Sequence, residues 1–158
     1  MQTNTTQAPT VLPRKQTNSQ GNGFWTQTPD SVDLRTQGEI EAQVGDVLRR
    51  YTLEYTGRGP EDVHAYLVGD LVIVKMSGVL TITEQHLAVG STEQGHRLIK
   101  LVRSHLIEMA RQDLTAAIRN CTLVDVLGLH HDINPMNGEE IFVFTLSGFP
   151  ATRPTKRK

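Results

Sequence analysis

The most compact group of side chains able to do chemistry is His130-His131-Asp132. Imidazole and carboxylate groups bind metals and carry protons. Neighbouring residues of a strand point to opposite faces, however, so the two imidazoles do not easily converge on one ion. A zinc site would need further ligands from elsewhere, and the single Cys121 offers no thiolate pattern. We therefore interpret these histidines as hydrogen-bonded loop residues, Cys121 as a small buried residue, and expect no metal or cofactor.

A second group, His86, Glu93 and His96, surrounds a helix break at Gly90. Because histidine titrates near neutrality, an acid–base pair is conceivable here. Ordinary surface residues of two helices are the interpretation that we favour. No nucleophile, base and orienting residue occur together at a recognisable spacing. The sequence gives no positive evidence for an enzyme, and we expect a non-catalytic protein.

A third group is cationic: Arg97, Lys100 and Arg103 lie close together along a predicted helix. They could receive an anion. They are equally well explained as the solvent-facing side of that helix, paired with Glu93 or Glu108.

An aromatic pair, Phe24-Trp25, interrupts a polar arm formed by residues 1–37. The arm is rich in Thr, Gln, Asn, Ser and Pro and cannot bury enough apolar area to offset its ordering entropy, so we predict disorder. The pair is either a docking motif for a partner or a segment that folds back on its own domain. Residues 148–158 form a loose basic tail, which we interpret as a solvated terminus.

Charge distribution argues against nucleic acid as a partner. Residues 37–146 hold 15 acidic and 9 basic side chains, a net charge of −6, whereas phosphate contacts need clustered lysine and arginine. No run approaches the ~20 apolar residues of a membrane helix, so we expect no membrane span. One cysteine suits a reducing compartment. We expect a cytoplasmic protein, and a peripheral position at the inner face of the membrane stays open.

The elements that position these groups follow from periodicity and turn signals. We predict helices over 38–56, 81–89 and 92–120, and strands over 63–68, 71–77, 123–129 and 140–146, with a long connection over 130–138. Thr81 and Glu84 have the spacing of a capping box. Because strands and helices do not alternate singly, this order predicts an α+β domain over 38–147. We expect an antiparallel four-stranded sheet with helices packed mainly on one face.

The two-residue turn Gly69-Asp70 fixes the register of the first hairpin. Directly opposite residues share a face, and one face is wholly apolar, which makes it the core side. Its pairs are Leu67 with Val72, Ala65 with Val74 and Val63 with Met76.

The other face of this hairpin is also unusually apolar. It carries Tyr66, Val68, Leu71 and Ile73. The apolar stripe of the helix over 92–120 is wider than packing on one sheet requires. We therefore predict a homodimer whose interface includes this face, with Arg58 as a candidate anchor for a carboxylate across it.

Three segments carry a resemblance to a known family: GRGP at 57–60, YLVGDLV at 66–72 and LTxxExxL at 80–87. In their order and spacing they resemble the MpsC-like family, and the similarity continues through 124–132 and 140–144. That bacterial family is named for a component of a sodium-translocating, membrane-potential-generating system.

The resemblance implies a soluble accessory or regulatory protein of a membrane cation or inorganic-carbon transport system, with transporter subunits as partners. A stand-alone regulatory or ligand-sensing dimer is the alternative. A small enzyme is the least favoured, because sodium translocation needs membrane spans that we do not find.

Overall fold

The computed structural model of the protein describes residues 34–90 and 93–154. The predicted disordered arm and the Phe24-Trp25 docking motif lie outside the described residues, apart from the last residues of the arm.

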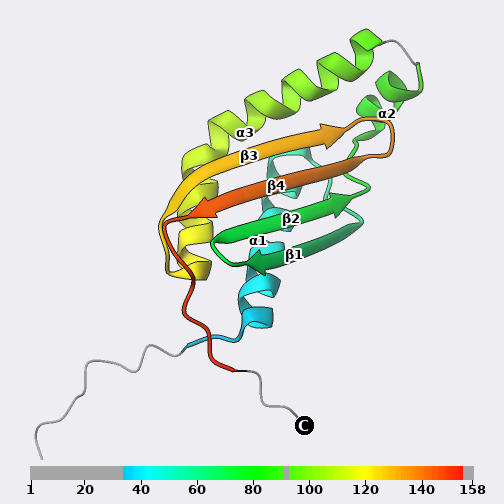
Figure 1. Ribbon diagram of the computed structural model, residues 1–158. Helices are drawn as coiled ribbons and strands as arrows, with labels where there is room; N and C mark the ends of the chain where they lie inside the picture. Colours follow the sequence, from blue (N-terminus) through cyan, green and yellow to red (C-terminus); the bar gives the residue numbers. More distant parts are fainter. Residues whose placement is uncertain (1–33, 91–92, 155–158) are drawn as a thin grey trace, which may run out of the picture. The chain divides into compact units, whose positions relative to one another are not determined.

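Seven elements follow one another in the order predicted from the sequence (Figure 1). They are α1 (Gln37–Thr56), β1 (Asp62–Val68), β2 (Leu71–Ser77), α2 (Ile82–Val89), α3 (Glu93–Thr122), β3 (Val126–Asn134) and β4 (Glu139–Leu146). The strands form one antiparallel sheet in the order β1-β2-β4-β3. The α+β class and the four-stranded antiparallel sheet are therefore confirmed.

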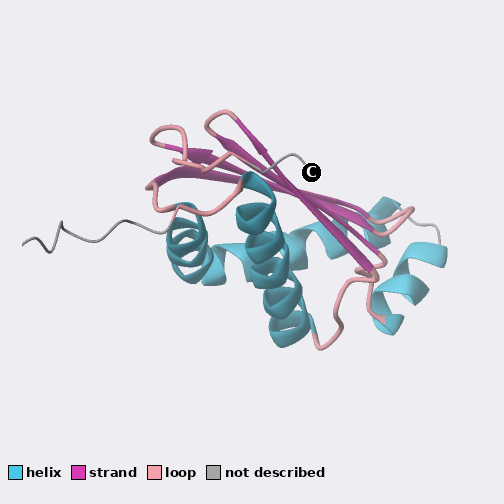
Figure 2. Ribbon diagram, turned by 90° about the horizontal axis from the view of Figure 1, so that it is seen from below, coloured by secondary structure: helices cyan, strands magenta, loops and turns pink. Residues whose placement is uncertain are grey.

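All three helices lie on one side of the sheet (Figures 1 and 2). No helix of the described residues covers the opposite side, which we call the outer face. The predicted packing of the helices on one face is confirmed.

The first hairpin has the predicted register, with Leu67 opposite Val72 and Val63 opposite Met76. The second hairpin differs from its prediction. β3 extends through Val126–Asn134, so His130 and His131 belong to a strand and not to a loop. The cause is cross-strand pairing: each residue from Gly128 to Asn134 has a partner on β4, a tertiary contribution that local turn signals do not reveal.

Capping residues set the helix ends. Thr36 and Glu39 form a capping box at the start of α1, and Thr81 and Glu84 form the predicted one at the start of α2. Gly57 ends α1 in the left-handed conformation at φ 75°, where a side chain would be strained.

The core lies between the sheet and the two longer helices. The inner face of the sheet contributes Val72, Val74, Met76, Phe142 and Phe144, and the helices contribute Ile40, Val44, Leu48, Ile107, Leu114 and Ile118. All these side chains are buried.

Side chains occupy part of both edges of the sheet. On edge strand β1, the N–H of Leu67 donates to Glu41 at 2.9 Å and its carbonyl accepts from Gln37 at 3.1 Å. On edge strand β3, the carbonyl of Leu129 accepts from Arg111 at 3.3 Å. These contacts disfavour the pairing of a further strand at Leu67 and at Leu129.

Within the described residues, no helix combines the length and the apolar character needed to cross a bilayer.

Candidate functional site

A buried arginine is the centre of the most unusual side-chain cluster. Arg103 projects from α3 and is only 2% exposed. Its Nε and Nη2 donate to the two carboxylate oxygens of Glu84, both at 2.7 Å, and Nη2 also donates to the carbonyl of Val79 at 2.8 Å. A bidentate pair of this kind is strong and directional. It therefore fixes the first turn of α2 against α3.

The cluster continues into the sheet through Glu140, which is also 2% exposed. Nη1 of Arg103 lies 3.5 Å from Oε2 of Glu140, and Nε2 of His131 lies 2.7 Å from Oε1 of the same carboxylate. Burial of charge is costly unless the charge is paired and hydrogen-bonded. These contacts supply the pairing, and they join α2, α3, β3 and β4. We call Glu84, Arg103, His131 and Glu140 the buried charge cluster.

The pKa values show which charges the buried charge cluster favours. Burial alone would raise the pKa of Glu84, but hydrogen bonds from Arg103 and from the N–H of Thr81 outweigh it and hold that pKa below its ordinary value. Burial would lower the pKa of Arg103, and its contacts with Glu84 and Glu140 instead raise it. Burial, together with the charge of Glu140, raises the pKa of the nearby Tyr51 hydroxyl. Glu84 is therefore an anion and Arg103 a cation at neutral pH.

Helix α2 depends on the buried charge cluster for its position. It has eight residues and none of them is buried. A helix this short is marginal in water, and of its residues only the partly buried Ala88 packs against the core. Its capping box and the Glu84–Arg103 pair add to this attachment.

The three cations suggested for an anion contact have different surroundings in the structure. Arg97 pairs with Glu93, and Nζ of Lys100 lies 2.8 Å from Asp132. Arg103 is turned into the protein, because it occupies the inward position of α3 between Ile99 and Ile107. The interpretation of these cations as a solvent-facing row is wrong for Arg103.

The histidines separate as alternation along a strand requires. His130 is exposed, and His131 faces inward to Glu140. His96 contacts the carbonyl of Ala88 at 3.3 Å. Across residues 34–90 and 93–154, no group of three or more His, Cys, Asp or Glu side chains could hold a metal ion. Cys121 is buried as predicted, and burial raises the pKa of its thiol.

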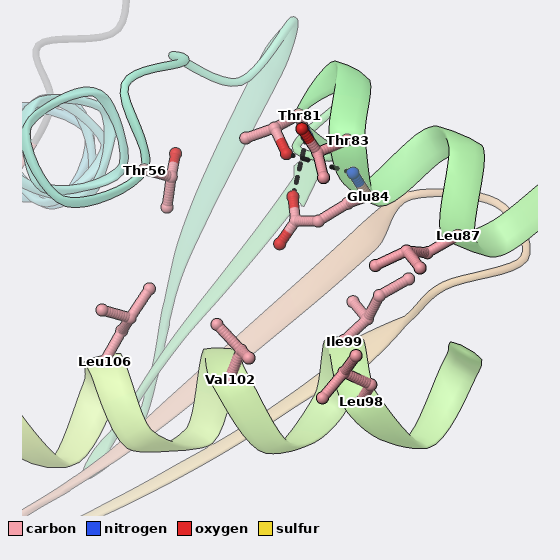
Figure 3. A pocket seen from close by; sticks show the side chains of 9 residues that line it. All are labelled: Thr56, Thr81, Thr83, Glu84, Leu87, Leu98, Ile99, Val102 and Leu106. Atoms are coloured by element: carbon pink, nitrogen blue, oxygen red, sulfur yellow. Dashed lines mark hydrogen bonds between the residues drawn. The ribbon is translucent and has the colours of Figure 1, made fainter. Parts of the chain in front are cut away.

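A groove opens beside the buried charge cluster, where α2 and the end of α1 face α3 (Figure 3). It encloses about 310 Å³. Its apolar walls are Leu87, Leu98, Ile99, Val102 and Leu106, and its polar end is formed by Glu84 with Thr81, Thr83 and Thr56. Glu84 thus contacts Arg103 and also lines the groove, which connects the surface to the buried charge cluster.

The outer face of the sheet is the second surface with exposed apolar side chains. Tyr66 and Val68 are 49% and 55% exposed, and Leu71 and Ile73 are half-buried. Arg58 lies in the loop between α1 and β1, where it pairs with Glu61 at 2.9 Å. These are the residues that the sequence suggested for a dimer interface.

Sequence reasoning missed Glu140 and the role of Glu84 beyond the capping box. A signal for Glu140 is present, because it lies in phase with Phe142, Phe144 and Leu146 at alternate positions of a predicted strand. A charged residue at an inward position indicates a buried partner of opposite charge. The same test applied to α3 would have identified Arg103.

Comparisons with known proteins agree with the resemblance. Residues 36–148 match the model of a family described as "Na+-translocating membrane potential-generating system (MpsC)". The uncharacterized protein YbcI of Bacillus subtilis is 32% identical over 112 residues, which cover 71% of this chain and 89% of YbcI.

A second relative, the uncharacterized protein YrhF of Bacillus subtilis, is 29% identical over 66 residues. The match covers 42% of this chain and 52% of YrhF, about half the length of that relative. No solved structure matches. Because the family model spans the whole of the sheet and its helices, this chain belongs to the MpsC family.

Proposed function

We propose that this protein is a non-catalytic accessory or regulatory component of a membrane system that transports a cation or inorganic carbon. The observation that carries the proposal is the family match, which extends from the cap of α1 to the end of β4 and names a sodium-translocating system. The proposed partners are transporter subunits in the membrane, met from the cytoplasmic side.

The chemistry of the buried charge cluster supports a non-catalytic role. Nη2 of Arg103 is engaged by Glu84 and the carbonyl of Val79, and Glu140 is engaged by Arg103 and His131. A catalytic acid or base must reach a substrate proton, at about 3 Å or through one water. Groups buried and committed to one another in this way stabilise the fold and are poorly placed to act on a substrate.

We also propose that two copies associate through the outer face of the sheet. Tyr66, Val68, Leu71 and Ile73 lie on it, and Ile141 of β4 extends the same surface at 42% exposed. Clustered apolar residues on the uncovered face of a sheet are typical of an interface. Sedimentation velocity of the full chain, with Ile73→Lys as the variant, tests this association: the variant is expected to be monomeric.

A second candidate function is that of a ligand-sensing module. The groove supports it, because its volume of about 310 Å³ is at the lower end for small-molecule pockets. A thermal-shift screen tests this function. A small molecule that binds in the groove and raises the melting temperature of the chain would favour this function over the first.

The direct test is affinity capture of the tagged full chain from native membranes solubilised in a mild detergent. We expect a multi-span membrane protein to be recovered in fixed proportion to the chain, and to be absent when the tag alone is used. Recovery of the chain without any membrane component would contradict the proposed function.

A further inference from the structure

We propose that the groove binds an amphipathic helix of a partner protein, with apolar residues of that helix against α3 and one lysine or arginine beside Glu84. The proposal rests on the proposed function for the origin of the helix, a cytoplasmic segment of a membrane partner. Three features of the described residues support it: the extent of the exposed apolar surface, the hydrogen-bonding state of Glu84 and the balance of charge.

The apolar surface extends well beyond the groove. Leu98 and Val102 line the groove, and Leu101 and Met109, which are 67% and 66% exposed, extend this stripe of α3 on either side of His105. The stripe spans 98–109, about 16 Å at 1.5 Å per residue. A small molecule that fills the groove would leave Leu101 and Met109 in water, whereas a helix of about three turns would cover the whole stripe.

Glu84 supplies a specific polar contact at one end of this surface. Its Oε2 accepts hydrogen bonds from Arg103 and from the N–H of Thr81, and its Oε1 accepts from Nε of Arg103. A carboxylate offers about four acceptor positions, so Oε1 can accept one more hydrogen bond. The side chain lines the groove, where a donor of the bound helix would reach it (Figure 3).

The balance of charge selects a cationic donor. The buried charge cluster sets two carboxylates, Glu84 and Glu140, against one guanidinium, and Glu140 also contacts the imidazole of His131. A second hollow follows further along the crevice between α1 and α3, and it is lined by Glu54 and Asp113 with one guanidinium, that of Arg50. Neither Glu54 nor Asp113 forms an ion pair within residues 34–90 and 93–154. This surface therefore complements a basic helix.

A second copy of this chain is a poorer occupant. Two copies that met at these surfaces would bring together the carboxylates that line them, Glu84, Glu54 and Asp113 of each copy. Cytoplasmic segments of membrane proteins are enriched in lysine and arginine close to the membrane, which is the chemistry that the groove complements.

The test uses a fluorescein-labelled 14-residue helical peptide of leucine and lysine, and a matched peptide of leucine and glutamate, titrated against the full chain by fluorescence anisotropy. The groove variant is Leu98→Gln/Val102→Gln. The control variant is Val68→Gln/Ile141→Gln on the outer face, where both side chains are exposed. We expect the basic peptide to bind, the groove variant to raise its Kd at least tenfold and the control variant to change it less than twofold.

Three results would overturn the inference: equal binding of the acidic peptide, an unchanged Kd for the groove variant, or a wild-type dimer that the groove variant converts to a monomer. Capture from membranes separates this inference from the proposed function. If the groove variant retains the membrane partner, the function stands and the groove inference fails. If no partner is captured but peptide binding depends on the groove, the proposed function fails alone.

Discussion

The groove and the outer face of the sheet both expose apolar side chains, but the residues that support the two surfaces differ in kind. Behind the outer face lies an apolar core that includes Val74, Phe142 and Phe144, fully buried. Beside the groove lies the buried charge cluster, which holds a helix that has no buried residue. The outer face therefore depends on apolar packing, and the groove depends on the pairing of buried charges.

This difference predicts that one substitution on α3 damages the groove side far more than any loss of a surface charge. Arg103→Met is expected to lower the free energy of unfolding by about 3–5 kcal/mol, because it leaves Glu84 and Glu140 buried without their cation. Chemical denaturation measures the loss. The matched control is Lys100→Met, which removes an exposed cation three residues away on the same helix.

A triple variant distinguishes two causes of that loss of stability: the uncompensated carboxylates and the changed packing around the side chain. Adding Glu84→Gln and Glu140→Gln to Arg103→Met removes the uncompensated charges, so part of the stability should return. A triple variant no more stable than Arg103→Met would show that packing around the side chain, and not charge pairing, is what α3 supplies.

At acid pH the fold should lose the stability that the Glu84 carboxylate contributes beside the groove. Because the folded state holds the pKa of Glu84 below its ordinary value of 4.5, this carboxylate stabilises the fold above that pH, and the contribution is lost as the pH falls through the folded pKa. Glu84→Gln is expected to cost about 2 kcal/mol at neutral pH and progressively less below about pH 4.5. Denaturation at a series of pH values between 7 and 3 tests this.

Glu108→Gln is the control for the acid titration. Contact with Arg111 lowers the pKa of Glu108, but the pair is exposed and close in sequence, so its effect on stability should be too small to resolve. A cost of Glu84→Gln that does not change with pH would contradict the role assigned to that carboxylate.

Substitutions of exposed residues in the walls of the groove should leave the fold intact. Leu98→Gln changes a side chain that is 46% exposed, and we expect the free energy of unfolding to change by less than about 0.5 kcal/mol. Thermal unfolding checks this expectation. The binding experiment depends on it, because the groove variant must be folded for its Kd to be interpreted. A loss of more than about 2 kcal/mol would place Leu98 in the core and remove it from the proposed docking surface.

The smallest effect is expected on the rim of the outer face. Lys75 pairs with Glu139 at 2.6 Å across neighbouring strands, and both side chains are partly exposed. Exposed pairs contribute little to stability. Lys75→Ala should therefore unfold at the same denaturant concentration as the wild type, and a clear shift would show that this pair does more than surface pairs usually do.

Local sequence signals predicted most of the architecture. The turn at Gly69-Asp70 gave the register of β1 and β2, and the Thr81–Glu84 spacing gave the start of α2. The extent of β3 was not predicted, because His130 to Asn134 are polar in part and become a strand only by pairing with β4. Such pairing is a tertiary effect that a window of sequence does not contain.

The candidate site was harder to predict than the fold. Arg103, Glu84 and Glu140 are up to 56 residues apart in the sequence, and only the packing of α2, α3 and β4 brings them together. Glu140 alternates with buried residues along β4, and this pattern indicates that its side chain is buried. The pattern does not identify the residue that pairs with the carboxylate. The groove has no local signal at all, because it is the space left between three helices.

The central claim is that the groove, and not the outer face, receives the basic helix, and methyl NMR of the full chain tests it most directly. Both surfaces carry leucine or valine methyl groups: Leu87, Leu98 and Val102 in the groove, and Val68, Leu71 and Val143 on the outer face. On titration with the leucine–lysine peptide, we predict saturable shifts for the groove methyl groups and none for the others. Shifts confined to the outer-face methyl groups would contradict the account.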